Sequence, residues 1–473
     1  MKRFFLALAV LLIALFGGWL GAAYWAGLRA EQLYHQSLQQ NSQDASLWIT
    51  SQDYQRGLLS SEAVSEITLQ GVQPAPGKAS DKLAFSLKHD IYHGILPIAW
   101  WLRGDFKPRP PQVIVRTVLG HDAPWSPVLD ALFGKRDPLT VVSYVALDGS
   151  SDNDITVPFL DVNNRLGLRT LNFSGLEGRI HSSPLDHSIQ GELSAKGLYA
   201  LLSEELGRSI RLTDLQFSVN QRYRRFNFPT GDSDLKIATL TTANLGDTPG
   251  TLTFTGLRIG THVQEQGDWV DSRFDLAIDD THWDETAIGS FLFKLSANKL
   301  DGAMLESLQR WSRQYNTDSD DSAAVQQLMT LLPAFLKRNP ELQLTIEANA
   351  PQGQLRGEAQ IVFQQPAKLV LYNPAQLLGA LSRAEANLSI AKALLESSLL
   401  NIHKAQMVAE ALREGREPDE DPLTIAAQLQ TQEELARWIN TRWLLLEDDT
   451  YRAQARFEQG RFYLNGIELP LPL

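Results

Sequence analysis

The residues from Phe4 to Leu28 contain no charged side chain, and Lys2 and Arg3 come directly before them. About 20 apolar residues are enough for a helix to cross the hydrocarbon core of a bilayer. We therefore expect residues 4–28 to form a transmembrane anchor.

A cleaved secretory signal is the alternative interpretation of this run. Gly21, Ala22 and Ala23 are small residues of the kind that precede a cleavage site. The apolar core of a secretory signal is usually about 7–15 residues long, and the run here is longer, which favours an anchor. Both interpretations place the rest of the chain across the membrane.

The charges beside the run predict its orientation. The positive-inside rule keeps Lys2 and Arg3 in the cytoplasm, whereas Arg29 and Glu31 on the far side nearly balance. We expect a single-pass protein of a bacterial inner membrane, with its C-terminal body in the periplasm. The chain has no cysteine, so this body would be stable without disulfides and offers no thiolate for catalysis or metal binding.

The formal net charge of −12 argues against a nucleic-acid partner, because contacts with phosphates require clustered Lys and Arg. The densest basic cluster is Arg222 to Arg225, next to Phe226 and Phe228. Alternating arginines are typical of a solvent-exposed strand edge, and we predict such an edge here.

Apolar and polar side chains alternate over most of the chain, which predicts strands. In the segment from Leu83 to His93, every second residue falls on one face of an extended chain. Asp148-Gly149 and Asn465-Gly466 are typical of tight hairpin turns, which require positive φ angles. We therefore predict an α+β, sheet-rich fold, in which one transmembrane helix precedes a large antiparallel-β body with several short helices. Further strands are expected near residues 113–119, 140–147, 155–160, 212–223, 252–259, 273–278, 290–296, 342–348 and 355–363.

Helical spacing of apolar residues is confined to a few segments. We expect helices at residues 322–337, 391–414 and 423–446, and another that opens at Asn373-Pro374. Pro418 and Pro422, in a charged stretch, mark a linker. The predicted organisation is an anchor at residues 1–28, an N-terminal β-rich region at 29–230 and a C-terminal β-rich region with helices at 231–473.

At three places a strand pattern passes directly into a helical pattern, and the junctions have similar composition. This similarity predicts a repeated unit of strands closed by a helix. Leu193-Ser194-Ala195 precedes a helical pattern at residues 198–206, Leu295-Ser296-Ala297 precedes one at 300–311, and Leu388-Ser389-Ile390 precedes one at 391–400. The alternative is that such a common triplet recurs by chance.

The motifs that resemble catalytic or metal sites do not meet the requirements of those sites. His89 and His93 have the spacing of a helical zinc motif, but in a strand their imidazoles would lie about 13 Å apart. The acidic run that ends at Asp321 lacks the glycine of a calcium loop and has Ala323 instead. Gly231 to Leu235 resembles the nucleophile block of a hydrolase with one extra residue, and turn chemistry explains it equally well. We assign no catalytic, cofactor-binding or metal-binding residue.

An apolar stripe runs along the predicted helix at 391–414. Such a stripe normally packs on the sheet of its own chain, and the alternative is a partner helix from an identical chain. Its members are Leu394, Leu395, Ile402, Ala405, Val408, Ala409 and Leu412.

The segment Tyr54-Gln55-Arg56-Gly57-Leu58-Leu59-Ser60-Ser61, shortly after the apolar run, resembles the signature of the YdgA-like family of bacterial envelope proteins, whose function is uncharacterised. Asp90 to Gly94, with His93 and Gly94, is similar to a second family segment, although Ile95 stands where relatives tend to have proline. The end of the chain, from Tyr451 to Glu468 with Asn465 and Gly466, resembles the closing hairpin of the family. The resemblance therefore covers nearly the whole chain.

The resemblance implies an inner-membrane protein with a periplasmic body and leaves its biochemistry open. The Tyr54–Ser61 segment itself favours a structural role, because Gly57 permits a close approach of the backbone and Arg56 offers five donors. We expect a non-catalytic envelope protein that binds lipid or a protein partner through an apolar groove. The alternatives are a self-associating structural protein, such as a homodimer, and a periplasmic hydrolase.

Overall fold

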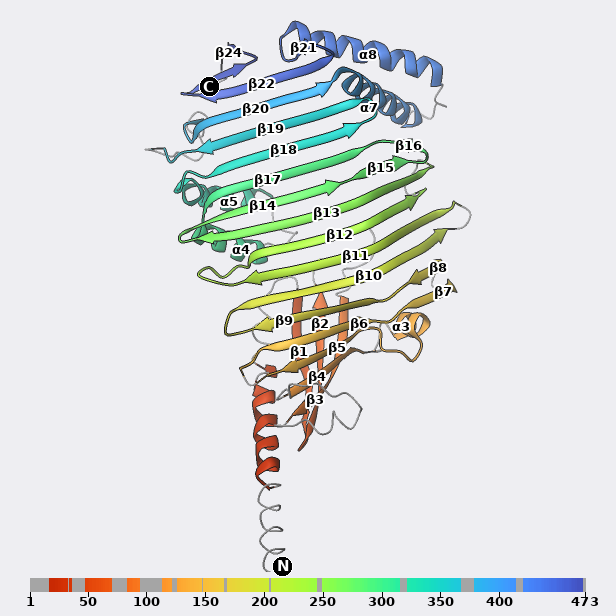
Figure 1. Ribbon diagram of the computed structural model, residues 1–473, viewed down its shortest axis with the longest axis vertical. Coiled ribbons are helices and arrows are strands. Elements are labelled where there is room, and N and C mark those ends of the chain that lie inside the picture. The colour runs from red at the N-terminus through yellow and green to blue at the C-terminus, as the bar shows by residue number, and fades with distance from the viewer. Residues whose placement is uncertain are drawn as a thin grey trace, which may run out of the picture. The chain divides into compact units, whose positions relative to one another are not determined.

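The computed structural model describes residues 17–32, 34–35, 47–69, 83–93, 113–120, 126–146, 148–165, 168–203, 206–244, 249–314, 321–366, 378–413 and 420–470. The chain divides into two compact units. Unit 1 comprises residues 1–233 and 309–324, and unit 2 comprises residues 234–308 and 325–473. Antiparallel strands form most of both units (Figure 1).

Unit 1 is built mainly from neighbouring antiparallel strands. The order of pairing is β1-β2-β3-β4-β5-β6-β9-β10-β11, and β7 and β8 extend from one end of β10. Residues 17–32, the N-terminal helix, and α3 (Ser126–Phe133) are helical. The strands are β1 (Leu47–Arg56), β2 (Ser60–Leu69), β3 (Leu83–His93), β4 (Val113–Leu119), β5 (Thr140–Val145), β6 (Ser151–Val157), β7 (Leu160–Arg165), β8 (Leu168–Phe173), β9 (Leu176–Ser183), β10 (Ser188–Ser203) and β11 (Arg208–Arg222).

Unit 2 contains a second run of antiparallel strands. They pair in the order β13-β14-β17-β18-β19-β20-β22-β23-β24, with β15 beside β13, β16 beside β15 and β21 beside β22. The strands are β13 (Thr251–Gln266), β14 (Trp269–Ile278), β15 (Asp280–Trp283), β16 (Thr286–Ala287), β17 (Ser290–Asp301), β18 (Glu341–Ala350), β19 (Gly353–Phe363), β20 (Leu381–Ala391), β21 (Leu445–Glu447), β22 (Thr450–Glu458), β23 (Arg461–Leu464) and β24 (Ile467–Leu469).

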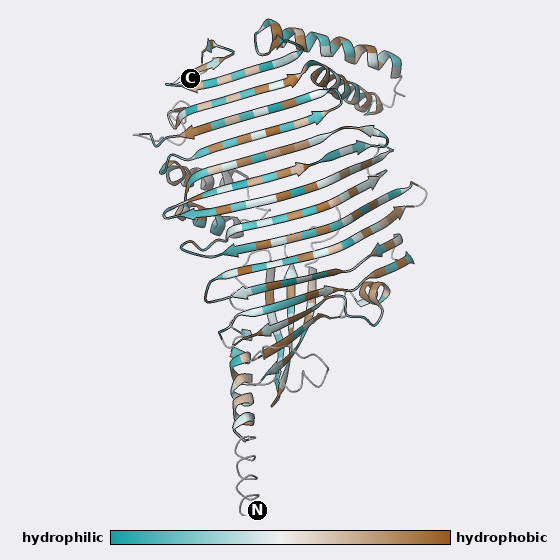
Figure 2. Ribbon diagram, in the orientation of Figure 1, coloured by the Kyte–Doolittle hydropathy of each residue, from teal (hydrophilic) through white to brown (hydrophobic). Residues whose placement is uncertain are grey.

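Helices α7 (Lys392–Arg413) and α8 (Glu420–Asn440) belong to unit 2. The division between the units falls within β12 (Thr230–Ala243), α4 (Gly302–Gln314) and α5 (Asp321–Leu336). Apolar and polar residues alternate along the strands, as the colours in Figure 2 show. This alternation is the pattern from which the sheet-rich fold was predicted, and that coarse prediction is confirmed.

The predicted helices of the last third are largely confirmed. Helices α5 and α7 match the predicted ranges within two residues. Helix α8 ends at Asn440 rather than Leu446, because the chain turns there and enters strand β21. The helix expected at Asn373-Pro374 and the acidic residues 318–320 lie outside the described residues.

Two of the three predicted strand-to-helix corners have that structure. Strand β17 leads into α4, and β20 leads into α7. The first corner was wrong, because β10 continues as a strand through Ser203 and pairs with both β8 and β11 over the predicted helix. Its residues from Leu198 to Leu202 are apolar enough for either structure, and these two neighbouring strands decide the outcome.

Residues 4–16 of the predicted anchor lie outside the described residues. Within the part that is described, no helix is both long and apolar enough to cross a membrane.

Candidate functional site

The N-terminal helix of unit 1 packs against the sheet through a row of small residues. Ala23, Ala26, Gly27 and Ala30 lie at helical spacing and are all buried. Ala30 joins a core cluster with Ala63 of β2, Ile91 of β3 and Val113 of β4. Small side chains let the helix backbone come close to these strands, and at Gly27 the backbone lies against the ring of His93.

His93 is only 1% exposed at the end of β3 and links the helix to the sheet. Its Nδ1 lies 3.1 Å from the carbonyl oxygen of Ala23, and its Nε2 lies 3.1 Å from the hydroxyl of Ser61 in β2. A carbonyl only accepts, so Nδ1 carries the proton and Nε2 accepts from Ser61. Burial lowers the pKa of His93, although its backbone hydrogen bonds act in the opposite direction.

His89 makes a second polar link, within the sheet. Its Nε2 lies 2.8 Å from the Ser65 hydroxyl, and its Nδ1 lies 2.9 Å from the hydroxyl of Thr117 in β4. Burial lowers the pKa of His89 to about 4, while the charge of Asp90 raises it slightly. The ring is therefore neutral near pH 7, where both nitrogens are already engaged by hydroxyl groups.

Arg56 and Tyr54 of β1 complete the contact with the N-terminal helix. The Arg56 guanidinium lies 2.8 Å from the Glu31 carboxylate and stands over the ring of Tyr24 at 5.3 Å. The ring of Tyr54 lies 5.4 Å from the ring of Tyr34. Burial is the main cause that raises the pKa of both tyrosines.

The turn between β1 and β2 depends on Gly57. Its N–H donates to the carbonyl of Ser60 at 2.9 Å, and a Cβ atom added at Gly57 would lie 2.4 Å from that oxygen. The structure therefore brings the signature residues Tyr54, Arg56, Gly57, Ser60, Ser61 and His93 together around the docked helix. The signature residue Gly94 lies outside the described residues.

The pair of Ser61 and His93 has the hydrogen bond of a nucleophile and its general base. Ser61 is 2% exposed, and the group that orients the imidazole is a backbone carbonyl of the N-terminal helix. With this burial the Ser61 hydroxyl is not accessible to a substrate in the structure. The arrangement therefore serves to join helix and sheet rather than to hold a substrate.

In unit 2, seven neighbouring strands present one continuous apolar face, which we call the apolar strip. The registers place Leu276, Phe293, Ile346, Gly357 and Leu388 in one row across five of these strands. Neighbouring rows on the same face are also apolar. The other members include Ile259, Phe274, Ile278, Phe291, Leu295, Leu342, Leu344, Ala348, Leu355, Ala359, Ile361, Ala384, Ala386, Ile390, Tyr451, Ala453, Ala455 and Phe457.

Helices cover the two edges of this strip, which lie at opposite ends of the strands. At one end Leu394, Leu395 and Leu399 of α7 pack against Ile390 and Tyr451. At the other end, Phe335 of α5 meets Phe363 of β19 with ring centroids 5.2 Å apart. Figure 1 shows α5 and α7 at opposite ends of these strands.

The middle of the apolar strip remains half-exposed. Leu295 of β17 is 40% exposed and Leu388 of β20 is 37% exposed, and Phe293 and Ile346 are only partly buried. A sheet face that packs on helices normally hides such side chains. Contiguous exposed apolar surface commonly marks a site of interaction.

The opposite face of the same strands is polar and contains a shallow hollow of about 540 Å³. Arg356 and Arg452 line it, but each lies beside a glutamate, at 2.7 Å from Glu358 and 3.3 Å from Glu447 respectively. These pairs leave no excess charge for an ionic ligand.

The signature residues Asn465 and Gly466 also line this hollow. Their φ angles of 48° and 79° are those of the hairpin turn expected from the sequence. The side chain of Asn465 accepts from the N–H of Gln454 and donates to the carbonyls of Arg442 and Trp443. Through these hydrogen bonds Asn465 holds the segment after α8 against strand β22.

Sequence reasoning missed the partner of the signature segment. The spacing of Ala23, Ala26, Gly27 and Ala30 was available as a sign of close helix packing, but the first three were attributed to the predicted anchor, which ended at Leu28. The predicted strand geometry of His89 and His93 is confirmed by β3. No group of three or more His, Asp or Glu side chains suited to a metal ion occurs within the described ranges.

The stripe predicted on the helix at 391–414 is divided between two environments. Leu394 and Leu395 pack on the sheet of their own chain, as expected. Ile402 and Leu412 are exposed. Phe226 and Phe228, beside the basic cluster, are buried and stacked on one another, so these rings are not available to nucleic-acid bases.

Residues 1–472 match the model of a family described as a bacterial protein of unknown function, DUF945. The chain belongs to this family. No curated protein and no solved structure matches it. The match spans both units, so the N-terminal helix, the signature segment and the apolar strip all lie within the sequence that defines DUF945.

Proposed function

We propose that this DUF945 protein is a non-catalytic, YdgA-like protein of the bacterial envelope, anchored in the inner membrane, whose periplasmic body binds lipid acyl chains along the apolar strip of unit 2. The single observation that carries the proposal is the half-exposed middle of that strip, around Phe293, Ile346 and Leu388.

The dimensions of the strip suit an acyl chain. Six steps of about 4.8 Å between neighbouring strands span about 29 Å. One leaflet of a bilayer contributes about half of a hydrocarbon core that is about 30 Å thick. The strip is therefore long enough to receive an extended acyl chain across the strands.

The chemistry of the strip also favours an acyl chain over a polar ligand. Its middle consists of aliphatic and aromatic side chains, and the charged residues of the same strands, such as Lys294 and Glu347, project from the opposite face. Binding would remove apolar surface from water at about 25 cal/mol for each Å² buried.

The N-terminal helix supports the placement beside a membrane. Its face from Ala23 to Ala30 packs on β1, β2 and β3, so residues 4–22 remain for the bilayer. This length is close to the number of residues that a spanning helix requires. Docking of the helix would hold unit 1 near the membrane surface, which is the source of the lipid.

Photocrosslinking tests lipid binding at the strip. A photoreactive phenylalanine analogue replaces Leu388, whose side chain lies on the strip, and the matched control replaces Ser389, which follows it and faces the other side of β20. The full chain is purified from cells, irradiated and examined by mass spectrometry. We expect lipid adducts at position 388 and none at position 389.

Two other functions make different predictions in the same experiment. A self-associating structural protein would give adducts with a second copy of the chain at position 388. A hydrolase would leave position 388 without adducts and would turn over ester or amide substrates. Absence of lipid at position 388, with the fold verified by circular dichroism, would overturn the proposal.

A further inference from the structure

Gly357 lies in the interior of strand β19, in the middle row of the apolar strip. The registers place it between Ile346 of β18 and Leu388 of β20. Glycine weakens the interior of a strand, and its usual reasons there are a bulge, a tight bend or the close approach of another backbone or of a ligand. The contacts of Gly357 distinguish between these reasons.

The backbone at position 357 does not require glycine. The φ angle of Gly357 lies outside the left-handed region, whereas Gly353 at the start of the same strand has a φ of 131°. The pairing of β19 with β18 and with β20 runs through position 357 without a register shift. A bulge or a turn therefore does not explain this glycine.

Neighbouring groups do not require glycine either. A Cβ atom added at Gly357 would lie 3.8 Å from Cδ1 of Leu388 and 4.0 Å from Cβ of Ile346, which are ordinary contact distances. Every other glycine in the strands that the structure describes either has a positive φ angle or would bring an added Cβ within 3.3 Å of a neighbouring atom. In unit 1, for example, a Cβ added at Gly178 would overlap Cδ2 of Leu193. Alanine would thus fit at position 357.

The remaining reason is the close approach of a ligand on the apolar strip. A side chain at position 357 would project on the same face as Ile346 and Leu388, because paired residues of neighbouring strands share a face. Leu388 is 37% exposed and Ile346 is only partly buried, so a ligand can reach this row. Two steps of about 4.8 Å between strands separate these two neighbours by about 9.6 Å. A hydrocarbon chain that lies over Gly357 can contact both side chains and the backbone of β19.

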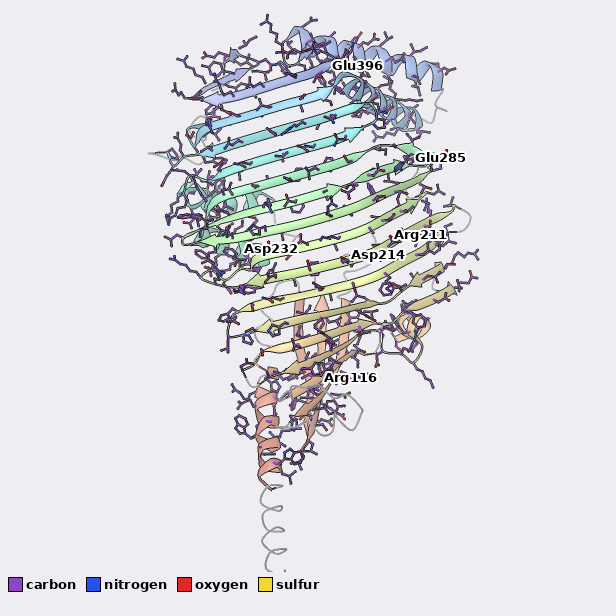
Figure 3. The ribbon with its side chains drawn as sticks, viewed as in Figure 1. Arg116, Arg211, Asp214, Asp232, Glu285 and Glu396 are labelled. Carbon is purple, nitrogen blue, oxygen red and sulfur yellow. The ribbon has the colours of Figure 1, made fainter. Side chains whose placement is uncertain are left out.

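Helix α7 forms a wall beside Gly357. Leu355, two residues earlier on the same face of β19, belongs to the cluster in which leucines of α7 pack on the sheet. The carboxylate of Glu396, which is labelled in Figure 3, accepts from the hydroxyl of Tyr451 at 3.1 Å and so ties α7 to β22. The row of Gly357 is the next row on this face after the covered one. An acyl chain in this row would have α7 on one side and the backbone of β19 beneath it.

We propose that Gly357 is the position at which the acyl chain of the bound lipid meets the sheet backbone, between Ile346 and Leu388 and beside α7. The inference rests on the proposed function, because it names the residue that admits that ligand. A chain of methylene groups is narrow enough to lie where position 357 carries no side chain. A residue larger than glycine would fill this space with its own side chain. Gly357 therefore determines whether the strip accepts an acyl chain.

Photolabelling with a palmitate analogue that carries a diazirine tests this assignment. Cells that express the full chain are fed the probe and irradiated, and the adducts on peptides of β18, β19 and β20 are measured by mass spectrometry. We expect Gly357→Val to lower the yield of adducts about tenfold, which corresponds to about 1.4 kcal/mol of binding free energy, and Gly357→Ala to lower it less. Gln354→Val, at an exposed position on the other face of the same strand, is the matched control and should be labelled as the wild type is.

Thermal unfolding of the delipidated chain separates an effect on the ligand from an effect on the fold, since a bound lipid would itself raise stability. A Cβ fits at position 357 and β-branched side chains suit strands, so both variants should unfold at the same temperature as the wild type or higher. A lower unfolding temperature for Gly357→Ala would show that the fold requires this glycine and would overturn the proposal. Equal labelling of Gly357→Val and the wild type would also refute it, while leaving the proposed lipid binding in place. A wild-type chain without adducts would refute both.

Discussion

The imidazole of His93 in β3 lies against the backbone of Gly27 in the N-terminal helix. A Cβ atom added at Gly27 would lie 2.7 Å from Cε1 of that ring. Position 27 therefore has room only for glycine as long as His93 keeps its hydrogen bonds with Ala23 and Ser61. The N-terminal helix, which overlaps the end of the predicted anchor, is thus fitted to the signature segment of the sheet.

Replacing Gly27 with alanine should loosen this contact. The added methyl group must displace His93 or the helix, and overpacking of this kind costs about 1–3 kcal/mol. Gly21→Ala is the matched control, because it gives the helix the same gain in propensity and a Cβ there would contact nothing within 4 Å. Hydrogen exchange of β3 should increase in Gly27→Ala alone. Equal exchange in both variants would show that helix and sheet are not packed as described.

Unit 1 should lose stability as the pH falls from about 6.5 towards 4. The pKa of His89 in the folded chain is about 4, below the ordinary value of 6.5, because burial opposes its charge. The neutral ring of His89 contributes fully to the free energy of unfolding above pH 6.5. This contribution is lost as the pH falls, because His89 is protonated in the unfolded chain at a higher pH than in the folded chain. The loss at this residue is no more than about 3.5 kcal/mol. His93, whose pKa is also lowered by burial, acts in the same direction.

Urea unfolding at pH 7.5, 6 and 5 measures this loss. His89→Asn removes the titrating ring and should flatten the dependence of unfolding free energy on pH, even if it lowers stability at pH 7.5. A slope that is the same in wild type and variant would assign the pH dependence to other groups.

Asn465→Ala should release the chain that follows α8. The substitution removes an acceptor for Gln454 and donors to Arg442 and Trp443, each bond being worth about 1 kcal/mol. It also places alanine at a φ of 48°, which favours asparagine or glycine. We expect a loss of about 2–4 kcal/mol in thermal unfolding. Asn465→Asp keeps the acceptor and should lose less. Equal losses would mean that the bond accepted from the N–H of Gln454 contributes nothing.

The membrane topology predicted from Lys2 and Arg3 has its own test. A reporter that is active only outside the cytoplasm, fused after Leu473, should be active. The protein should also remain in the membrane fraction after an alkaline wash. Release of a mature body that lacks residues 1–23 would leave export in place and rule out the anchor.

The local elements of the chain were largely predictable from its sequence. The alternation from Leu83 to His93 predicts β3 because successive side chains of a strand face opposite sides. The apolar spacing at 391–414 predicts α7, and Asn465-Gly466 predicts a hairpin turn because few other residues accept positive φ. The strand, the helix and the turn each depend on residues that are neighbours in the sequence, so the order of residue types is enough to predict them.

Contacts between distant segments were decided only by the tertiary structure. The pattern at residues 198–202 suits a helix as well as a strand, and pairing with β8 and β11 selects the strand. The contact of Gly27 with His93 joins residues far apart in sequence, and no local pattern specifies which face of the helix meets which strand. The exposure of Ile425 and Leu429 on α8 likewise depends on the contact with α7, where His403 bonds to Thr431 and Glu434. The apolar residues of α8 are visible in the sequence, but burial is a property of packing, and so the sequence could not tell which of them would be left exposed.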